Sequence, residues 1–189
     1  MTVKAPYIVG VGGALRPGSS TEKAMRLTLA AAERAGARTK LICGEALNLP
    51  MYQPESPERT DAARAMVAEL ALADGIILGS PGYHGSISGF VKNALDYAED
   101  LRGSERPYFS GRAVGCIATA GGWPGAVHTL GALRDIVHAL RGWPTPMGAA
   151  INTSDKVFDA DGKCNAPRVA EMLEMIALEV VGFHHARGK

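Results

Sequence analysis

The sequence predicts an α/β fold in which one parallel sheet is covered by helices on both faces. Short apolar runs rich in β-branched residues alternate along the chain with longer segments whose apolar residues recur at helical spacing. The apolar runs are continuous, as expected for strands that are buried on both faces. Because crossover connections between parallel strands are right-handed, the helices between them pack on both sides of the sheet.

The first third of the chain supplies two strands and a helix. Residues 7–11 (YIVGV) are expected to form the first strand. Residues 21–35 carry alanine and leucine at helical spacing, and Gly36 is expected to end that helix because glycine readily adopts the left-handed conformation. Residues 39–43 are expected to form the second strand, and residues 47–57 a proline-rich connection.

The middle of the chain repeats this alternation. Residues 60–73 are expected to form a helix, and the apolar run at residues 75–79 (GIILG) the third strand. A helix over residues 89–101 should then lead to the fourth strand at residues 113–119. Residues 126–140 have a stripe of leucine and valine at helical spacing and are expected to form the fourth helix.

The last third is less regular. Residues 145–151 form a weaker fifth strand because Pro146 interrupts them. Residues 152–167 are a polar loop in which Asp161-Gly162 suggests a short hairpin. Residues 169–184 are expected to form a closing helix.

Length and composition narrow the classes of function. The 189 residues, 47% of them hydrophobic, suit a single domain over residues 1–189. Twenty basic and nineteen acidic residues leave a charge of +1, so no basic surface for nucleic acid or acidic membranes is expected. No apolar run approaches the roughly 18 residues of a membrane span, and residues 1–10 are too short a segment for a signal peptide.

The three cysteines point to a cytoplasmic protein. Cys43, Cys116 and Cys164 are few, odd in number and widely spaced, which fits a reducing compartment better than a disulfide framework. Cys43 and Cys116 lie in apolar strand-like runs and are expected to be buried. No pair of cysteines or histidines has the spacing of a metal site.

Three glycine-rich loops follow strands of the predicted sheet. They cover residues 12–20, 80–88 and 120–125. In open α/β sheets, ligands bind beyond the carboxyl ends of the strands, where the strand order reverses. Three such loops at one edge predict a ligand site there.

The first loop, GVGGALRPGSSTEKA, has the character of a phosphate site. It leads from a strand into a helix, so free backbone N–H groups and the positive end of the helix dipole face an anion. Ser19 stands where a nucleotide triphosphate loop needs lysine, and Leu15 stands where a dinucleotide fingerprint needs its third glycine. A single phosphate monoester fits best, held by Arg16 and the hydroxyls of Ser19, Ser20 and Thr21. The same residues are also explained by an ordinary turn and a Ser19-x-x-Glu22 capping box.

The second and third loops suit a flat ring. Glycines in Pro81-Gly82-Tyr83-His84-Gly85-Ser86 let backbone approach closely, Tyr83 can wall the ring in, and His84 can donate to its polar edge. Packing against the following helix is the alternative for Tyr83. For His84 the alternative is an exposed loop position or packing against a helix. Residues 119–125 offer N–H groups that stabilise negative charge on a ring edge, although a mobile turn explains them as well.

These motifs resemble those of the NAD(P)H-dependent FMN reductases, a flavodoxin-like group that includes quinone, azo-dye and chromate reductases. The similarity runs through nearly the whole chain, and its most specific part is residues 81–89 followed by Lys92-Asn93-Ala94-Leu95-Asp96. The resemblance implies a three-layer flavodoxin-like sandwich with a five-stranded parallel sheet in the order 2-1-3-4-5 and FMN where the order reverses. It also implies that residues 89–101 contribute to a homodimer or homotetramer.

The resemblance further implies roles for individual residues. Arg16, Ser19 and Thr21 would hold the FMN phosphate, Pro81 to His84 would line the isoalloxazine ring, and Thr119, Gly121 and Gly122 would meet its pyrimidine edge. Tyr83 and His84 could tune the flavin, and no residue is expected to act as a general acid or base. The residues expected to bind the cofactor are Gly13, Leu15, Arg16, Ser19, Ser20, Thr21, Pro81, Gly82, Tyr83, His84, Gly85, Ser86, Thr119, Ala120, Gly121 and Gly122.

Three of these positions depart from the family pattern. Gly82 stands where many relatives carry Glu or Val. The resemblance therefore implies that a side chain near the flavin is absent here. His84 stands where Asn or Arg is common, and Thr21 where Asn is common. Asp96 is expected at an interface or in a partner's site, and Trp123 at the ring or a subunit contact.

The implied reaction is hydride transfer from NADPH or NADH to the flavin and onward to a second acceptor, such as a free flavin or a quinone. Reduced flavin could also be released to a monooxygenase. A flavodoxin-type electron carrier and a non-catalytic FMN-binding module are the alternatives, and the near-neutral charge argues against the first. Arg102, Arg106 and Arg112 are candidates for a nicotinamide 2′-phosphate, although surface arginines are more often only solvated.

Overall fold

The computed structural model describes residues 5–187. Residues 1–4, on which the expectation of no signal peptide partly rests, lie outside this range. The strands are β1 (Tyr7–Gly12), β2 (Arg38–Ile42), β3 (Gly75–Tyr83), β4 (Ser86–Ile87), β5 (Ala113–Ala120), β6 (Trp143–Pro144) and β7 (Ala149–Asn152). The helices are α1 (Ser20–Arg34), α2 (Asp61–Leu72), α3 (Gly89–Asp96), α4 (Trp123–Ala139) and α5 (Pro167–Arg187), with short 3₁₀ helices η1 (Gly44–Leu47), η2 (Tyr97–Leu101) and η3 (Thr153–Asp155).

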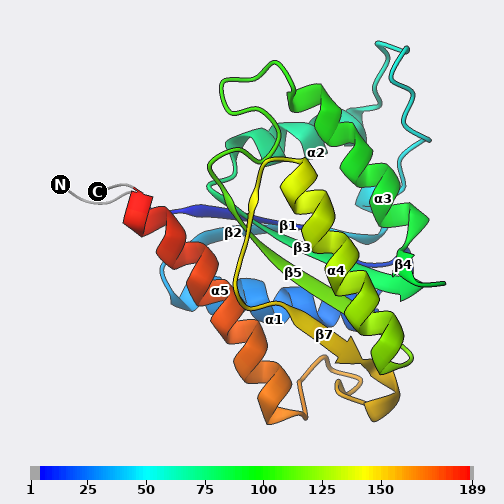
Figure 1. Cartoon of the computed structure of the whole chain (residues 1–189), viewed down its shortest axis with the longest axis vertical. Helices are drawn as coiled ribbons and strands as arrows, with labels where there is room; N and C mark the ends of the chain where they lie inside the picture. The colour runs from blue at the N-terminus through cyan, green and yellow to red at the C-terminus, as the bar shows by residue number, and fades with distance from the viewer. Residues whose placement is uncertain (1–4, 188–189) are drawn as a thin grey trace.

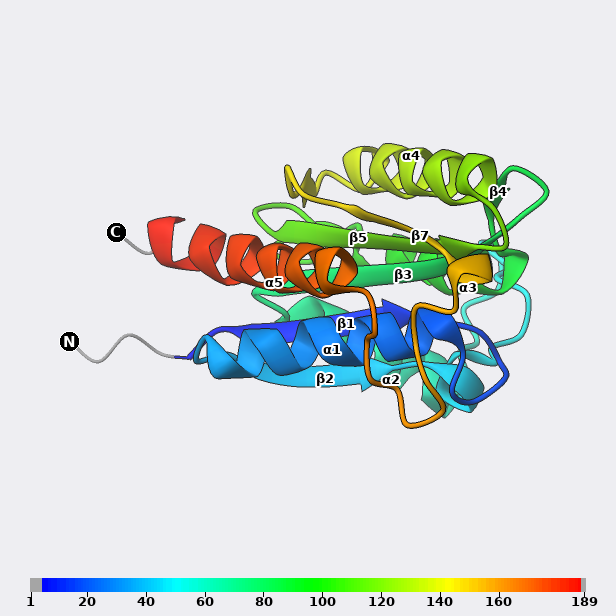
Figure 2. The same ribbon diagram turned by 90° about the horizontal axis from the view of Figure 1, so that it is seen from below.

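The strands form one sheet between two layers of helices. Helices α1 and α5 lie side by side on one face, and α2, α3 and α4 cover the other (Figures 1 and 2). A separate apolar core fills the space on each side of the sheet. The predicted α/β class, with a largely parallel sheet covered on both faces, is confirmed.

Side chains from the sequence explain where three helices begin. Ser19, Thr60 and Ser88 each accept a hydrogen bond from the backbone N–H three residues later, at the starts of α1, α2 and α3. Such caps satisfy backbone donors that would otherwise have no partner. After α1 the chain turns at Gly36, whose φ of 90° is the left-handed conformation expected for it.

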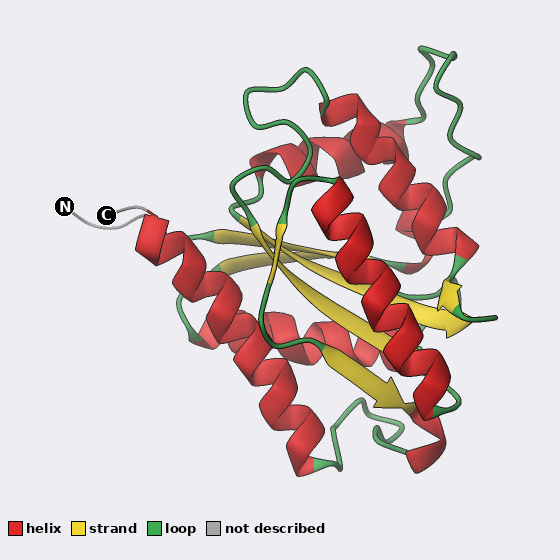
Figure 3. Cartoon of the chain, in the orientation of Figure 1, coloured by secondary structure: helices red, strands yellow, loops and turns green. Residues whose placement is uncertain are grey.

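The expected count of five strands is wrong. Within residues 5–187 the sheet has seven strands, in the order β2-β1-β3-β5-β6. Strand β7 also pairs with β5 in parallel, and β4 pairs with β3 in the antiparallel direction. The loop predicted after the third strand therefore contains the end of β3 and all of β4 (Figure 3).

The predicted fifth strand is divided into β6 and β7. Pro144 and Pro146 have no N–H to give to a sheet. Side chains from elsewhere bind the backbone between the two strands: Arg134 donates to the carbonyls of Thr145 (3.0 Å) and Pro146 (2.7 Å). Glu179 of α5 accepts the N–H of Met147 at 2.9 Å. These partners replace the sheet hydrogen bonds that a continuous strand would make.

Two other expectations about the elements differ in detail. The helix expected over residues 89–101 is divided into α3 and η2, and α4 begins at Trp123 instead of residue 126, with Pro124 in its first turn. The hairpin expected at Asp161-Gly162 is present as a bridge between Phe158 and Cys164.

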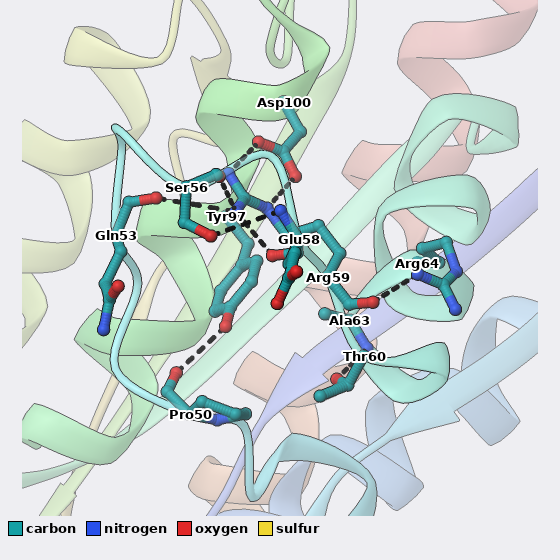
Figure 4. A network of polar contacts seen from close by, with 10 residues as sticks. All are labelled: Pro50, Gln53, Ser56, Glu58, Arg59, Thr60, Ala63, Arg64, Tyr97 and Asp100. Atoms are coloured by element: carbon teal, nitrogen blue, oxygen red, sulfur yellow. Dashed lines mark hydrogen bonds and ion pairs between the residues drawn. The ribbon is translucent and has the colours of Figure 1, made fainter.

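The connection between η1 and α2, residues 48–60, projects beyond the sheet at the upper right of Figures 1 and 3. Arg59 holds it in place (Figure 4). The guanidinium makes two hydrogen bonds to Asp100, at 2.7 and 2.9 Å, and donates to the carbonyls of Ser56 and Glu58. It also lies over the rings of Tyr52 and Tyr97. One side chain thus ties this long connection to η2.

Among the helices of residues 5–187, none is both long enough and apolar enough to cross a membrane. Within the same residues, no group of three or more His, Cys, Asp or Glu side chains is placed to hold a metal ion. Cys43, Cys116 and Cys164 are all free thiols. Cys116 is buried as expected, whereas Cys43 is only half-buried.

Candidate functional site

The three glycine-rich loops meet in one groove at the carboxyl ends of the parallel strands. Its volume is about 390 Å³, which is within the usual range for small-molecule sites. The groove is lined by Ala14, Leu15, Arg16, Ser19, Ser20, Thr21, Pro81, Gly82, Tyr83, Thr119, Ala120, Gly121 and Thr153. Eleven of these thirteen residues belong to the predicted set; Ala14 and Thr153 do not.

Two glycines, which have no side chain, allow the first loop to run in close contact with β3 where it leaves the sheet. A Cβ atom on Gly12 would lie 1.9 Å from the carbonyl oxygen of Gly79, and Gly12 has a φ of 144°. The N–H of Gly13 donates to the same carbonyl at 2.9 Å. Gly13 is thus a support of the loop and does not itself line the groove.

The end of the groove nearest α1 has the character of an anion site. Ser19, Ser20 and Thr21 lie at the start of α1, where the helix dipole favours negative charge. Arg16 lies exposed on the loop, and within residues 5–187 its guanidinium has no ion-pair partner. A free cation beside a helix N-terminus is a suitable arrangement for a phosphate group.

The carboxylate of Glu22 uses one N–H group of this loop. It accepts the N–H of Gly18 at 2.9 Å and pairs with Arg26 at 2.7 Å, while Ser19 Oγ accepts the N–H of Glu22. Burial by itself would raise the pKa of Glu22, but the hydrogen bonds from Arg26 and Gly18 outweigh it and the pKa is lowered. The predicted capping box is present, except that the carboxylate reaches Gly18 instead of the N–H of Ser19.

The second loop is a β-hairpin that extends past the sheet. Tyr83 and Ser86 pair across it, and the two residues between them, His84 (φ 50°) and Gly85 (φ 89°), form the turn. Positive φ at both central residues is typical of two-residue hairpin turns. Pro81, Gly82 and Tyr83 line the groove, but His84, Gly85 and Ser86 do not. Gly85 follows the histidine because this turn requires positive φ at its second central residue.

Gly82 serves helix packing. A Cβ atom there would lie 2.3 Å from Thr129 Oγ1 and 3.1 Å from the carbonyl oxygen of Gly125, both on α4. The Thr129 hydroxyl in turn donates to the carbonyl of Ser86 at 3.2 Å. Any side chain at this position would therefore meet α4, because the helix occupies that space.

The third loop and the start of η3 close the groove. Thr119 lies at its floor, and its hydroxyl is 2.7 Å from that of Thr21. Gly121 lines the groove, whereas Gly122 does not; Gly122 precedes α4 without any side-chain cap. Thr153 Oγ1 donates to the carbonyl of Ala120 at 3.1 Å. Thr153 follows the last predicted strand, so its position at a carboxyl end was the signal that could have identified it.

Other residues singled out in the sequence lie away from the groove. Trp123 borders a different, apolar groove of about 770 Å³ beside β7 and α5. Arg106 and Arg112 donate to carbonyls at the end of α2, beside a cavity of about 640 Å³ at the opposite edge of the sheet. Arg102 and Asp96 form surface ion pairs with Glu99 and Lys92, respectively. Arg106 and Arg112 thus lie at the opposite edge of the sheet from the groove.

Comparisons with known proteins found a matching family and several relatives. The family model described as NADPH-dependent FMN reductase matches residues 6–156. An FMN-dependent NADPH-azoreductase of Staphylococcus aureus (strain USA300) is 41% identical over 90 residues, which are 48% of this chain and 44% of that protein. The chain thus matches under half the length of this curated relative.

Solved structures share the fold. FerB, a flavoenzyme NAD(P)H:(acceptor) oxidoreductase from Paracoccus denitrificans, matches with a TM-score of 0.75 and 22% identity, covering 96% of this chain and 98% of FerB. A flavodoxin, WrbA-like protein from Agrobacterium tumefaciens matches with a TM-score of 0.64 and 16% identity, covering 97% and 99% of the two chains. At these identities the likeness concerns the fold alone, which is flavodoxin-like. Because the family model matches most of the chain, residues 6–156, the chain belongs to the NADPH-dependent FMN reductase family.

Proposed function

We propose that the chain binds FMN in the groove and uses it to carry electrons from a reduced nicotinamide to a second small-molecule acceptor. The observation that supports this most is the convergence of three separate loops on one groove with two chemically different ends. One end has the free guanidinium of Arg16 beside the start of α1. The other has the ring of Tyr83 and the bare backbone of Gly121.

The residues present suit FMN better than a nucleotide triphosphate or a dinucleotide. The first loop offers one cation and one helix N-terminus, which match a single phosphate. Residues 12–20 contain no lysine, and the carboxylate of Glu22 occupies the N–H of Gly18, so little remains to hold a second phosphate. Arg16, Ser19 and Ser20 would hold the phosphate, and Pro81 to Tyr83 with Thr119 to Gly121 would border the ring.

FMN, when bound, supplies the redox chemistry by accepting a hydride from a reduced nicotinamide and passing electrons on. The protein's residues orient the ring and exclude water from part of it. The backbone at Gly121 and the hydroxyl of Thr119 place hydrogen-bond donors at one edge of the groove, where they would stabilise negative charge. No side chain needs to act as a general base, and none in the groove has a paired acid.

The family and the relative support one choice of hydride donor. We propose NADPH as the donor, because the family description and the name of the S. aureus enzyme both specify it. An azo dye, a quinone or a free flavin is the proposed acceptor class, with a flavin-dependent monooxygenase as a partner if reduced flavin is released. We also propose a cytoplasmic homodimer or homotetramer; the unpaired cysteines support the reducing compartment.

The test is an absorbance spectrum of purified protein after incubation with FMN and gel filtration, followed by anaerobic NADPH. Retained flavin absorbance that bleaches with NADPH, with recovery on adding a quinone, supports the proposal. Bound FMN that NADPH never bleaches would instead indicate a flavodoxin-type carrier or a binding module. Protein that binds no FMN at any concentration would overturn the proposal altogether.

A further inference from the structure

The hydroxyls of Thr21 and Thr119 meet in the floor of the groove. Thr21 is the second residue of α1, and Thr119 is the seventh residue of β5. Their oxygens lie 2.7 Å apart, and the two residues are only 1% and 3% exposed. This is a short, buried hydrogen bond between residues 98 positions apart in the chain. It joins the phosphate end of the groove directly to its ring end.

Packing fixes the orientation of Thr21. A Cβ atom on Gly79 would lie 3.1 Å from Thr21 Cγ2, so the methyl group of Thr21 sits against the bare backbone of β3. Since a β-branched side chain has few χ1 rotamers, this contact leaves the hydroxyl directed toward β5. The Thr21 hydroxyl is therefore engaged by Thr119 on the β5 side of the groove.

Thr119 is held from both sides by the sheet. It pairs in register with Pro81 of β3 and with Ile151 of β7. Within the hydroxyl pair one proton is shared between the two oxygens, and the second hydroxyl retains a proton of its own. Both residues line the groove, so that second proton can be donated to a ligand there.

We infer that Thr21 is a positioning residue for Thr119 and thereby for the ring end of the ligand, and that it is not a ligand of the phosphate. The inference rests on the proposed function, and it differs from the role that the resemblance implies for Thr21. The inference predicts that loss of the Thr21 hydroxyl weakens the binding of flavins with and without a phosphate to the same extent.

The experiment compares FMN with riboflavin, which has the same ring and no phosphate. Dissociation constants are measured by quenching of flavin fluorescence for wild type, Thr21→Val and Thr119→Val. Thr21→Val should weaken the binding of both flavins by about fivefold, the effect of losing one hydrogen bond. The ratio of the variant's dissociation constant to that of wild type should be the same for FMN and riboflavin within about twofold. Thr21→Ser, which keeps the hydroxyl, should restore both affinities.

Arg16→Ala is the matched control, because it should weaken FMN and leave riboflavin unchanged. Thr21→Val should also shift the visible spectrum of bound flavin in the same direction as Thr119→Val. The double variant should bind flavin with an affinity within about twofold of that of Thr119→Val. Thr21→Ala replaces Thr21→Val if the latter fails to fold.

The outcomes separate the two proposals. Wild-type protein that binds neither flavin overturns the proposed function. Wild-type binding with a Thr21→Val defect for FMN alone shows that Thr21 is a phosphate ligand and overturns the inference only. Unchanged affinities in Thr21→Val, or independent effects of the two threonines, overturn it as well.

Discussion

Thr21 and Thr119 connect the first helix to strand β5 through a hydrogen bond of 2.7 Å between their hydroxyls. The bond is possible because Gly79, between them on β3, has no side chain; a Cβ atom there would also meet Met25 at 2.3 Å. Close packing of α1 on β3 therefore brings the first loop and the third within reach of one ligand. The positions of the two ends of the groove follow from this contact.

Gly82→Ala should destabilise the fold by about 1–3 kcal/mol, as overpacking usually does. The added methyl group would lie 2.3 Å from Thr129 Oγ1 and would force α4 or the hairpin to move. Chemical denaturation gives the free energy of unfolding. Gly89→Ala is the control, because a Cβ atom at Gly89 meets nothing within 4 Å. Equal stability of the two variants would show that Gly82 is not packed against α4 in solution.

Arg16→Ala should weaken FMN binding by about three- to tenfold at low ionic strength, since an exposed charge contributes about 1 kcal/mol. The difference from wild type should shrink as salt is added, because exposed charges are screened. Arg102→Ala removes another exposed arginine, one that does not line the groove, and should leave the affinity unchanged. Isothermal titration in two salt concentrations measures this. A salt-independent defect would contradict the assignment of Arg16 to the phosphate.

Glu22→Gln should make the protein less sensitive to acid. The pKa of Glu22 is lowered in the folded state, so its contribution to stability is present above the ordinary glutamate pKa and is lost as the pH falls through the lowered value. Near neutral pH the variant should unfold about 2–4 °C below wild type, the shift expected from losing about 1 kcal/mol. The gap should close as the pH falls below the ordinary glutamate pKa and through the lowered pKa of Glu22.

Thermal unfolding scans across this pH range measure the gap. Glu174→Gln is the control, because Glu174 makes only an exposed ion pair with Arg34 at 3.5 Å. A gap that stays constant at all pH values would mean that the Glu22 carboxylate is not stabilised by its partners.

Arg59→Ala should release the connection at residues 48–60 and lower the free energy of unfolding by about 1–3 kcal/mol. The variant loses both hydrogen bonds to Asp100 and those to the carbonyls of Ser56 and Glu58. Limited proteolysis should cut the connection sooner than in wild type, while FMN affinity stays unchanged. Arg102→Ala should match wild type in both assays. Unaltered proteolysis of Arg59→Ala would show that the connection is held by other contacts.

Much of the fold could be predicted from local patterns. The continuous apolar runs gave the parallel strands, and the serine and threonine caps marked the helix starts at Ser19, Thr60 and Ser88. The rule that ligands bind at the carboxyl ends of strands then placed three loops at one edge, and the structure brings them into one groove.

The remaining features depend on partners distant in the chain. Arg134 and Glu179 divide the last strand in two, and neither is near residues 145–148 in the sequence. The turn at His84-Gly85 was missed because asparagine, not histidine, is the usual signal for positive φ at its first position. Likewise, no local pattern indicates that the hydroxyl of Thr21 is committed to Thr119.

A crystal structure of the protein with FMN tests the central claim most directly. The account predicts the phosphate at the start of α1, within hydrogen-bond distance of Arg16, Ser19 or Ser20, and the ring between residues 81–83 and 119–121. Flavin bound in the apolar groove beside β7, or at the opposite edge of the sheet, would contradict it.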